Sequence, residues 1–253
     1  MLPGNVSSQF VSGLLFALPL CDNDNEISLT PPVESRSYID LTLSALRAFG
    51  IRAEWKDACT LAIAGRQRYC AQEIAVEGDY SNAAFLDAFS LLGGGVEVSG
   101  LREDSLQGDR VYRAHFRSLA DGTPHISLAD CPDLGPILFS LAAALNGAVF
   151  TDISRLRIKE SDRVACMKTE LEKFGAVLDV EENRVTIRKA ELHAPTEALY
   201  GHNDHRIVMS LSVLAACLPL GTPVIIDDAH AITKSFPDFF DRLRELGVQV
   251  VEE

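Results

Sequence analysis

Four basic residues stand where the sequence predicts helices to begin. They are Lys159, Arg163, Arg206 and Lys234. The first turn of a helix carries unpaired backbone N–H groups and the positive end of the helix dipole, so a cation there is unfavourable unless an anion lies nearby. The recurrence of this costly placement predicts sites for small anions such as phosphate or carboxylate groups.

Neighbouring acidic residues offer a second explanation for the same four cations. They are Glu160, Asp162, Asp204 and Asp238. Each could neutralise an adjacent cation as a surface ion pair, a contact that contributes little to stability. At any one position the two explanations are about equally good, whereas the four positions together favour anion binding.

Further polar side chains stand at other predicted helix starts. They are Ser7, Ser8, Gln9, Ser35, Tyr38 and Asp133. A serine in such a place can bind an anion or simply cap the helix. Because no third ligand accompanies His202 and His205 at a suitable spacing, we expect no metal site. Residues 93–95 are glycines but lack the lysine and the spacing of nucleotide-binding loops, so we also expect no nucleotide cofactor.

Composition excludes several classes of partner. The chain of 253 residues has 23 Lys and Arg against 36 Asp and Glu, a net charge of −13, which argues against nucleic acid and anionic membranes. Its six scattered cysteines are typical of reduced thiols, so we expect a cytoplasmic protein. The apolar stretch 10–20 is too short to span a bilayer, and no basic residue precedes it as in a signal peptide.

Two sequence patterns alternate along the chain and predict a repeated unit. The first is a helix of small residues followed by a strand, at residues 10–20, 83–92, 136–145 and 207–218. The second is an amphipathic helix that ends at Phe-Gly or Leu-Gly and precedes two strands, in segments that begin near Ser44, Met167 and Phe240, the last of which is cut short. Together they give a βαβαββ unit and an α/β (α+β) fold, although a generic α/β sandwich with accidental similarity remains an alternative.

The units are expected at residues 7–65, 81–129, 133–190 and 203–253. In the third unit the second helix is predicted at 159–174. The second unit is degenerate, because no clear second helix and strand pair is visible between Leu101 and Asp130. At this length, the chain is predicted to form one large or two modest domains.

Six motifs, in this order, resemble the 5-enolpyruvylshikimate-3-phosphate (EPSP) synthase family. They are GNVSSQF, VEGDYS, CPDLGP, RLRIKESDR, NDHRIVMS and ITKSFPDFF. IKESDR, NDHR and KSFP together are highly specific, whereas SSQF alone is weak. The resemblance implies the enolpyruvyl transferase fold, in which repeated units form two lobes with helix starts facing a cleft. It places the lobes at 1–76 and 77–253, with the first lobe incomplete.

The resemblance also implies a role for each polar residue. The phosphate of shikimate 3-phosphate would bind Ser7, Ser8 and Ser35, and its ring would contact Gln9 and Tyr38. Its hydroxyl groups would contact Asp133 and Lys159. Phosphoenolpyruvate would bind Gln9, Arg163, Arg206 and Lys234, because guanidinium and ammonium groups suit carboxylate and phosphate. The catalytic residues would be Asp133 for the hydroxyl proton, Glu160 for the methylene carbon, and His205 and Lys234 at the leaving phosphate.

The implied reaction is the enzymatic addition of the 5-hydroxyl of shikimate 3-phosphate to phosphoenolpyruvate, followed by loss of phosphate. It requires no metal, no cofactor and no covalent enzyme intermediate. Two family motifs, Lys-Ser and Asn-Ala-Gly-Thr, are absent from this sequence, which is therefore interpreted as N-terminally truncated. A second chain could supply them, or the chain could bind ligands without turnover. Within the same enzyme class, the alternative substrate is UDP-N-acetylglucosamine, which SSQF, NDHR and KSFP match less well.

Overall fold

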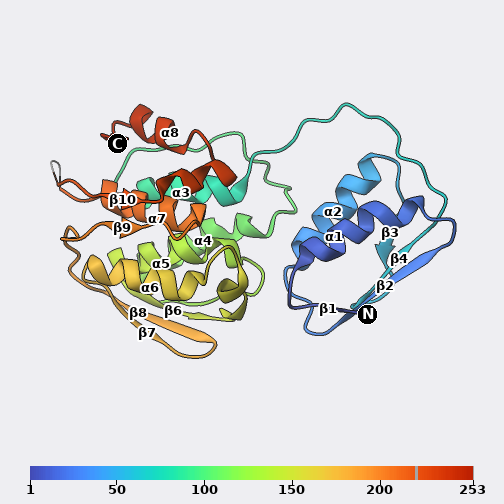
Figure 1. Ribbon diagram of the computed structural model, residues 1–253, viewed down its shortest axis with the longest axis horizontal. Helices are drawn as coiled ribbons and strands as arrows, with labels where there is room; N and C mark the ends of the chain where they lie inside the picture. The colour runs from blue at the N-terminus through green and yellow to red at the C-terminus, as the bar shows by residue number, and fades with distance from the viewer. Residues whose placement is uncertain (220–221, 253) are drawn as a thin grey trace. The chain divides into compact units, whose positions relative to one another are not determined.

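The computed structural model describes residues 1–219 and 222–252, which form two compact units of mixed α/β structure (Figure 1). The first unit comprises Met1–Glu77 and Arg102–Gly108, and the second comprises Gly78–Leu101 and Asp109–Glu253. The predicted α/β class is confirmed.

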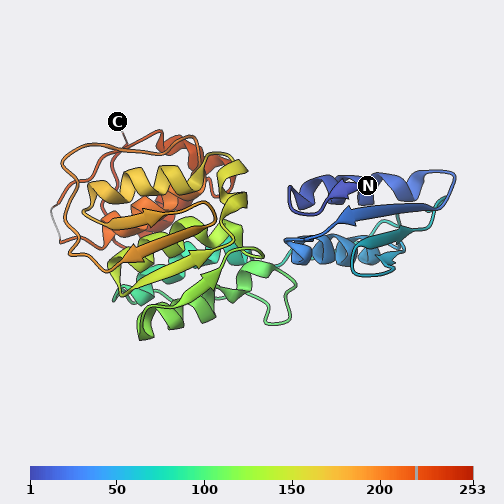
Figure 2. The same ribbon diagram turned by 90° about the horizontal axis from the view of Figure 1, so that it is seen from below.

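The first unit is a four-stranded sheet with two helices packed on one of its faces (Figures 1 and 2). Strand order in the sheet is β1-β2-β4-β3. In chain order the elements are β1 (Leu2–Pro3), α1 (Ser8–Ala17), the 3-10 helix η1 (Leu18–Leu20), β2 (Asn25–Thr30), α2 (Arg36–Ala48), β3 (Ala53–Trp55) and β4 (Thr60–Ile63). Alternate residues of β2, Ile27 and Leu29, are buried against the helices, as expected for a half-buried strand.

Helix α1 accounts for most of the apolar stretch at 10–20. Val11 and Leu15 are buried in the core of the first unit, whereas Phe10 and Leu14 are 65% and 37% exposed. Within residues 1–219 and 222–252, no helix combines the length and the apolar character needed to cross a membrane.

The second unit contains a four-stranded sheet of order β5-β6-β8-β7 and a two-stranded parallel sheet of β9 and β10. Its helices are α3 (Tyr80–Leu91), α4 (Tyr112–Asp121), α5 (Gly135–Ala144), α6 (Arg163–Lys173), α7 (His205–Ala216) and α8 (Phe239–Glu245). Its 3-10 helices are η2 (Gly108–Val111), η3 (Pro132–Leu134), η4 (Ser154–Ile158) and η5 (Ala229–Lys234). Its strands are β5 (His125–Ser127), β6 (Gly147–Thr151), β7 (Val177–Val180), β8 (Arg184–Arg188), β9 (Leu199–Tyr200) and β10 (Ile226–Asp227).

Helix α5 forms the centre of the second unit. Residues 135–143 are all buried, and the helix contacts α3, α4, α6 and α7 as well as the sheet. A helix buried on every side must be apolar all round, which explains its run of small and apolar residues. This packing fixes the starts of α6 and α7, where the predicted site residues lie.

The repeated patterns are largely confirmed. The four small-residue helices are α1, α3, α5 and α7, and the amphipathic helices are α2, α6 and α8. Strand pairs follow α2 and α6 as predicted. Helix α6 begins at Arg163, four residues after the predicted start of that helix.

Three predictions about secondary structure are wrong. Residues 93–101, all described, form no strand; there the carbonyl of Val96 accepts a hydrogen bond from the Ser90 hydroxyl in place of a strand partner. Residues 246–252, also described, form no strand, and the carbonyl of Val250 binds Arg244 Nε at 3.3 Å. The degenerate unit does have a second helix, α4.

Candidate functional site

Two acidic residues begin the helices that carry the predicted arginines. Asp162 caps α6, and its carboxylate accepts hydrogen bonds from the N–H groups of Val164 (3.1 Å) and Ala165 (3.0 Å). Asp204 caps α7 and accepts from the N–H of Arg206 at 3.0 Å. These caps satisfy backbone donors and place negative charge at the positive end of each dipole.

Arg163 lies at the centre of the site and is fully buried. Its Nε donates to Asp204 Oδ2 at 2.9 Å, its Nη1 to Asp133 Oδ1 at 2.8 Å and its Nη2 to Glu160 Oε2 at 2.6 Å. One guanidinium therefore joins carboxylates from η3, from the loop before α6 and from the start of α7. A planar fork of five donors is suited to this task, and a lysine could not replace it.

Two further cations contact Asp133. Arg206 Nη2 donates to Asp133 Oδ2 at 3.2 Å, and Lys159 Nζ lies 3.3 Å from Asp133 Oδ1. Arg206 is 8% exposed, and its Nε has no hydrogen-bond partner among the described residues. The predicted residues Asp133, Lys159, Arg163 and Arg206 are thus brought together in one cluster.

The neighbouring cations determine the pKa values of the carboxyl groups in this cluster. Burial by itself would raise the pKa of Asp133, but the charges of Arg206, Arg163 and Lys159 outweigh it and hold that pKa well below its ordinary value. Burial likewise opposes ionisation of Asp204, and Arg163 holds the pKa of Asp204 below its usual range. Burial by itself would lower the pKa of Arg163, but the negative charges of Asp133 and Asp204 outweigh burial and raise that pKa above its ordinary value. Both carboxylates and the guanidinium are therefore charged at neutral pH.

The sequence left open whether bound anions or acidic residues neutralise the four cations, and in the structure acidic residues do so for several of them. Glu160 pairs with Arg163 three positions away, as the second explanation proposed, and its side chain is 40% exposed. Asp204 instead pairs with Arg163 across 41 positions, in a fully buried contact. Asp238 instead pairs with Arg242 at 2.9 Å. Asp133 was expected to contact substrate, and its three cationic neighbours were not predicted.

His205 is uncharged near neutral pH. It is 5% exposed, and burial together with the charge of Arg206 lowers its pKa to about 4. Its Nδ1 has no hydrogen-bond partner among the described residues. A neutral imidazole at this place can exchange a hydrogen bond or a proton with a ligand without first losing a proton to solvent.

This shifted pKa predicts a pH dependence of stability. Unfolded His205 takes up a proton below about pH 6.5, whereas folded His205 does so only near the pKa of about 4. The unfolded state binds more protons between these values, so stability falls as pH falls through that window, by about 2 kcal/mol after allowance for solvent screening. Urea unfolding of wild type and His205→Gln at pH 7 and pH 4.5 measures it. An equal loss in both proteins would contradict the assignment.

Lys234 and Lys159 correct the view that all four cations begin helices. Lys234 is the last residue of η5, five positions before α8, and Lys159 follows η4 in an extended conformation. The ammonium of Lys234 donates to the backbone carbonyl of Asn203 and, at 2.7 Å, to its side-chain oxygen. Lys234 therefore joins the cluster through the residue that precedes Asp204, and the dipole argument applies only to Arg163 and Arg206.

The serines of the first unit lie at the starts of α1 and α2. Ser7 caps α1, and its hydroxyl accepts a hydrogen bond from the N–H of Gln9 at 3.3 Å, with Ser8 as the first helical residue. Ser35 precedes α2, is fully buried and has a left-handed backbone (φ 50°), and Tyr38 lies in the first turn. Both predicted groups therefore stand at helix starts.

The loops before α1 and α2 are held side by side. Strands β1 and β2 are parallel neighbours, and the N–H of Glu34 donates to the carbonyl of Gly4 at 3.0 Å. A Cβ at Gly4 would lie 2.6 Å from the Thr30 carbonyl oxygen and 2.8 Å from that of Pro32. Only glycine permits this approach, which brings the serines of the two helices to the same edge of the sheet.

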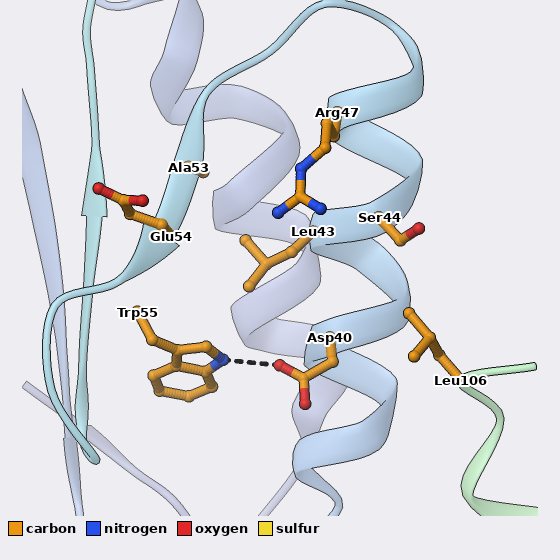
Figure 3. A pocket seen from close by; sticks show the side chains of 8 residues that line it. All are labelled: Asp40, Leu43, Ser44, Arg47, Ala53, Glu54, Trp55 and Leu106. Carbon is orange, nitrogen blue, oxygen red and sulfur yellow. Dashed lines mark hydrogen bonds between the residues drawn. The ribbon is translucent and has the colours of Figure 1, made fainter.

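A hollow of about 220 Å³ lies elsewhere on the first unit, beside α2 and β3 (Figure 3). Its lining residues are Asp40, Leu43, Ser44, Arg47, Ala53, Glu54, Trp55 and Leu106. Trp55 Nε1 donates to Asp40 Oδ1 at 2.7 Å, and the Arg36 guanidinium lies 3.9 Å from the Trp55 ring centroid. None of the predicted site residues in the described chain lines this hollow, but Trp55 reports on the start of α2.

The family model of EPSP synthase (3-phosphoshikimate 1-carboxyvinyltransferase) matches residues 2–243. The 3-phosphoshikimate 1-carboxyvinyltransferase of Clostridium acetobutylicum is 38% identical over an alignment that covers 99% of this chain and 61% of the relative. That of Clostridioides difficile is 35% identical, with coverage of 98% and 60%. The chain thus spans about three fifths of the length of the curated relatives it matches.

Solved structures share the fold at lower identity. An EPSP synthase from Acinetobacter baumannii superposes with a TM-score of 0.76 at 22% identity, over 96% of this chain and 61% of that one. The enolpyruvyl transferase NikO from Streptomyces tendae gives a TM-score of 0.64 at 15% identity, over 91% and 57%. At these identities the likeness shows the enolpyruvyl transferase fold, which the sequence predicted.

Proposed function

We propose, on the premise that this chain belongs to the EPSP synthase family, that it takes part in transferring the enolpyruvyl group of phosphoenolpyruvate to the 5-hydroxyl of shikimate 3-phosphate. The products are 5-enolpyruvylshikimate 3-phosphate and phosphate. We further propose that the lobes correspond to residues 1–76 and 77–253. A cytoplasmic location is supported by the six free cysteines.

The observation that carries the proposal is the buried cluster around Arg163. Three cations, Lys159, Arg163 and Arg206, meet there around Asp133. Phosphoenolpyruvate has a carboxylate and a phosphate, the two groups that guanidinium forks bind best. We assign these anions to Arg163 and Arg206, with Lys234 and Gln9 as further ligands.

Shikimate 3-phosphate is assigned to both groups of residues. Its phosphate binds the hydroxyl groups of Ser7, Ser8 and Ser35 at the starts of α1 and α2, where backbone N–H groups favour anions. Gln9 and Tyr38 contact its ring, and Asp133 and Lys159 its hydroxyl groups.

The ionisation of Asp133 suggests how substrates control the reaction. With three cations beside it, this carboxylate has a strongly lowered pKa and is a poor base. An anion that draws the charges of Arg163 and Arg206 toward itself raises the basicity of Asp133, so the 5-hydroxyl loses its proton only when phosphoenolpyruvate is bound. Glu160 then handles the proton that the methylene carbon takes up. Neutral His205 and Lys234 hydrogen-bond the leaving phosphate.

The test is phosphate release by the full chain with phosphoenolpyruvate and each of two acceptors. Release with shikimate 3-phosphate, but not with UDP-N-acetylglucosamine, is the expected result. Binding of both substrates without release would support the alternative of a ligand-binding chain that needs a further polypeptide for turnover. The emission of Trp55, the only tryptophan, provides a binding signal for shikimate 3-phosphate at α2.

A further inference from the structure

Two buried residues with no assigned role in the reaction, Ser81 and Asp109, are linked to Arg206 by hydrogen bonds. Ser81 is the second residue of α3 and is 6% exposed, and Asp109 in η2 is 3% exposed. Arg206 Nη1 donates to Ser81 Oγ at 2.9 Å, and the Ser81 hydroxyl donates to Asp109 Oδ2. A chain of hydrogen bonds thus runs from the guanidinium through a hydroxyl to a carboxylate.

The direction of this chain is fixed by its chemistry. A guanidinium can only donate, so Ser81 Oγ must accept from Arg206. A serine hydroxyl has one proton, which Ser81 donates to Asp109 Oδ2. Asp109 therefore holds the hydroxyl in the single orientation that presents lone pairs to Arg206.

The second arm of Arg206 is held differently. Its Nη2 donates to Asp133, which is shared with Arg163 and Lys159 and is assigned to substrate. A ligand that engages Asp133 weakens this second contact. The contact with Ser81 remains. Because Ser81 Oγ is a neutral acceptor, it holds the guanidinium of Arg206 without neutralising the positive charge.

We propose that Ser81 and Asp109 are positioning residues that aim Arg206 at the anion of phosphoenolpyruvate. The inference rests on the proposed function of Arg206 and adds two residues to it. Ser81 is the last residue of the motif VEGDYS, but the sequence predicted no role for Ser81 or for Asp109.

The test is a double-mutant cycle on phosphoenolpyruvate binding, measured by calorimetry with the full chain. Ser81→Ala should weaken binding by about tenfold, the size expected for loss of one hydrogen bond to a charged group. It should cause no further loss in the Arg206→Ala background, because its effect passes through that side chain. Asp109→Asn, which keeps an acceptor for the hydroxyl, should retain more affinity than Asp109→Ala.

A matched control is Ser212→Ala. Ser212 is also 6% exposed, lies on α7 with Arg206, and donates to the Val208 carbonyl at 2.8 Å rather than touching the arginine. Its variant should bind phosphoenolpyruvate as wild type does. An equal loss in Ser212→Ala, or an additive loss in the Arg206→Ala background, would overturn the inference.

A second readout does not depend on the ligand. In ¹⁵N NMR spectra, the guanidinium signals of Arg206, assigned with Arg206→Ala, should broaden and exchange faster with water in Ser81→Ala. Unchanged signals would overturn the positioning role even if phosphoenolpyruvate binds. If wild type fails to bind phosphoenolpyruvate, the proposed function fails, and these signals alone decide the inference.

Discussion

Arg163→Ala is expected to lower the free energy of unfolding of the second unit by about 3–5 kcal/mol. Removing this buried guanidinium strips three carboxylates of a partner at 2.6–2.9 Å, on Asp133, Glu160 and Asp204. Asp204 is fully buried, so its charge would lose its principal cation in a place that solvent does not reach. Urea unfolding followed by far-ultraviolet circular dichroism measures the loss.

The matched control is Arg242→Ala. Arg242 also pairs with two acids, Asp238 and Glu245, but its side chain is 48% exposed. Solvent screens such pairs, so the change should be far smaller. Trp55 lies in the first unit, and its emission should keep its unfolding midpoint in both variants. A loss no larger in Arg163→Ala than in Arg242→Ala would show that the buried network does not stabilise the unit.

The same variant should reverse the acid response of the cluster. In wild type the pKa of Asp204 is lowered in the folded state, so its contribution is present above the ordinary carboxyl pKa and is lost as pH falls below it. Without Arg163, burial dominates and raises that pKa above its unfolded value. Stability of Arg163→Ala should then increase as pH falls from about 6 to 4, once the His205 contribution is subtracted. The His205→Gln background provides that subtraction.

Periodicity predicted the helices better than the strands. The small-residue helices were visible because a helix such as α5 must be apolar on every side when it is central. Residues 93–101 alternate as a strand would, yet a strand also needs a partner for its backbone groups, and sequence alone did not show that none was in place. Helix α4 was missed although Tyr112, Phe116 and Leu119 have helical spacing and are buried.

Residue types indicated that the polar side chains of the second unit form one cluster, but not which of them pair with each other. Asp133 contacts Arg163 across 30 positions and Arg206 across 73, so the pairing follows from the packing of η3, α6 and α7. The start of the helix near Lys234 was predicted too early, because KSFP resembles a helix start. Helix α8 begins two residues after Pro237. Local signals identify caps and cations, and only the fold shows which charges face each other.

Arg206→Ala is expected to weaken phosphoenolpyruvate binding by about 1.5–3 kcal/mol, the range for a hydrogen bond to a charged group. Arg206 is 8% exposed, and its guanidinium is held at Nη1 by Ser81 and at Nη2 by Asp133. A side chain fixed in this way loses little conformational entropy when the anion binds. Calorimetric titration with phosphoenolpyruvate measures the change.

Arg188→Ala separates this contact from the general effect of removing a positive charge. Arg188 lies on β8 in the same unit, pairs with Asp179 and is 66% exposed, so its variant has the same net charge but leaves the cluster intact. If both variants lost equal affinity, long-range charge rather than a direct contact would explain the loss, and raising the salt concentration would abolish the difference from wild type. A direct contact predicts the opposite: Arg206→Ala loses more affinity than Arg188→Ala, and this difference between the two variants persists at high salt, because a hydrogen bond to the ligand remains after long-range charge effects are screened.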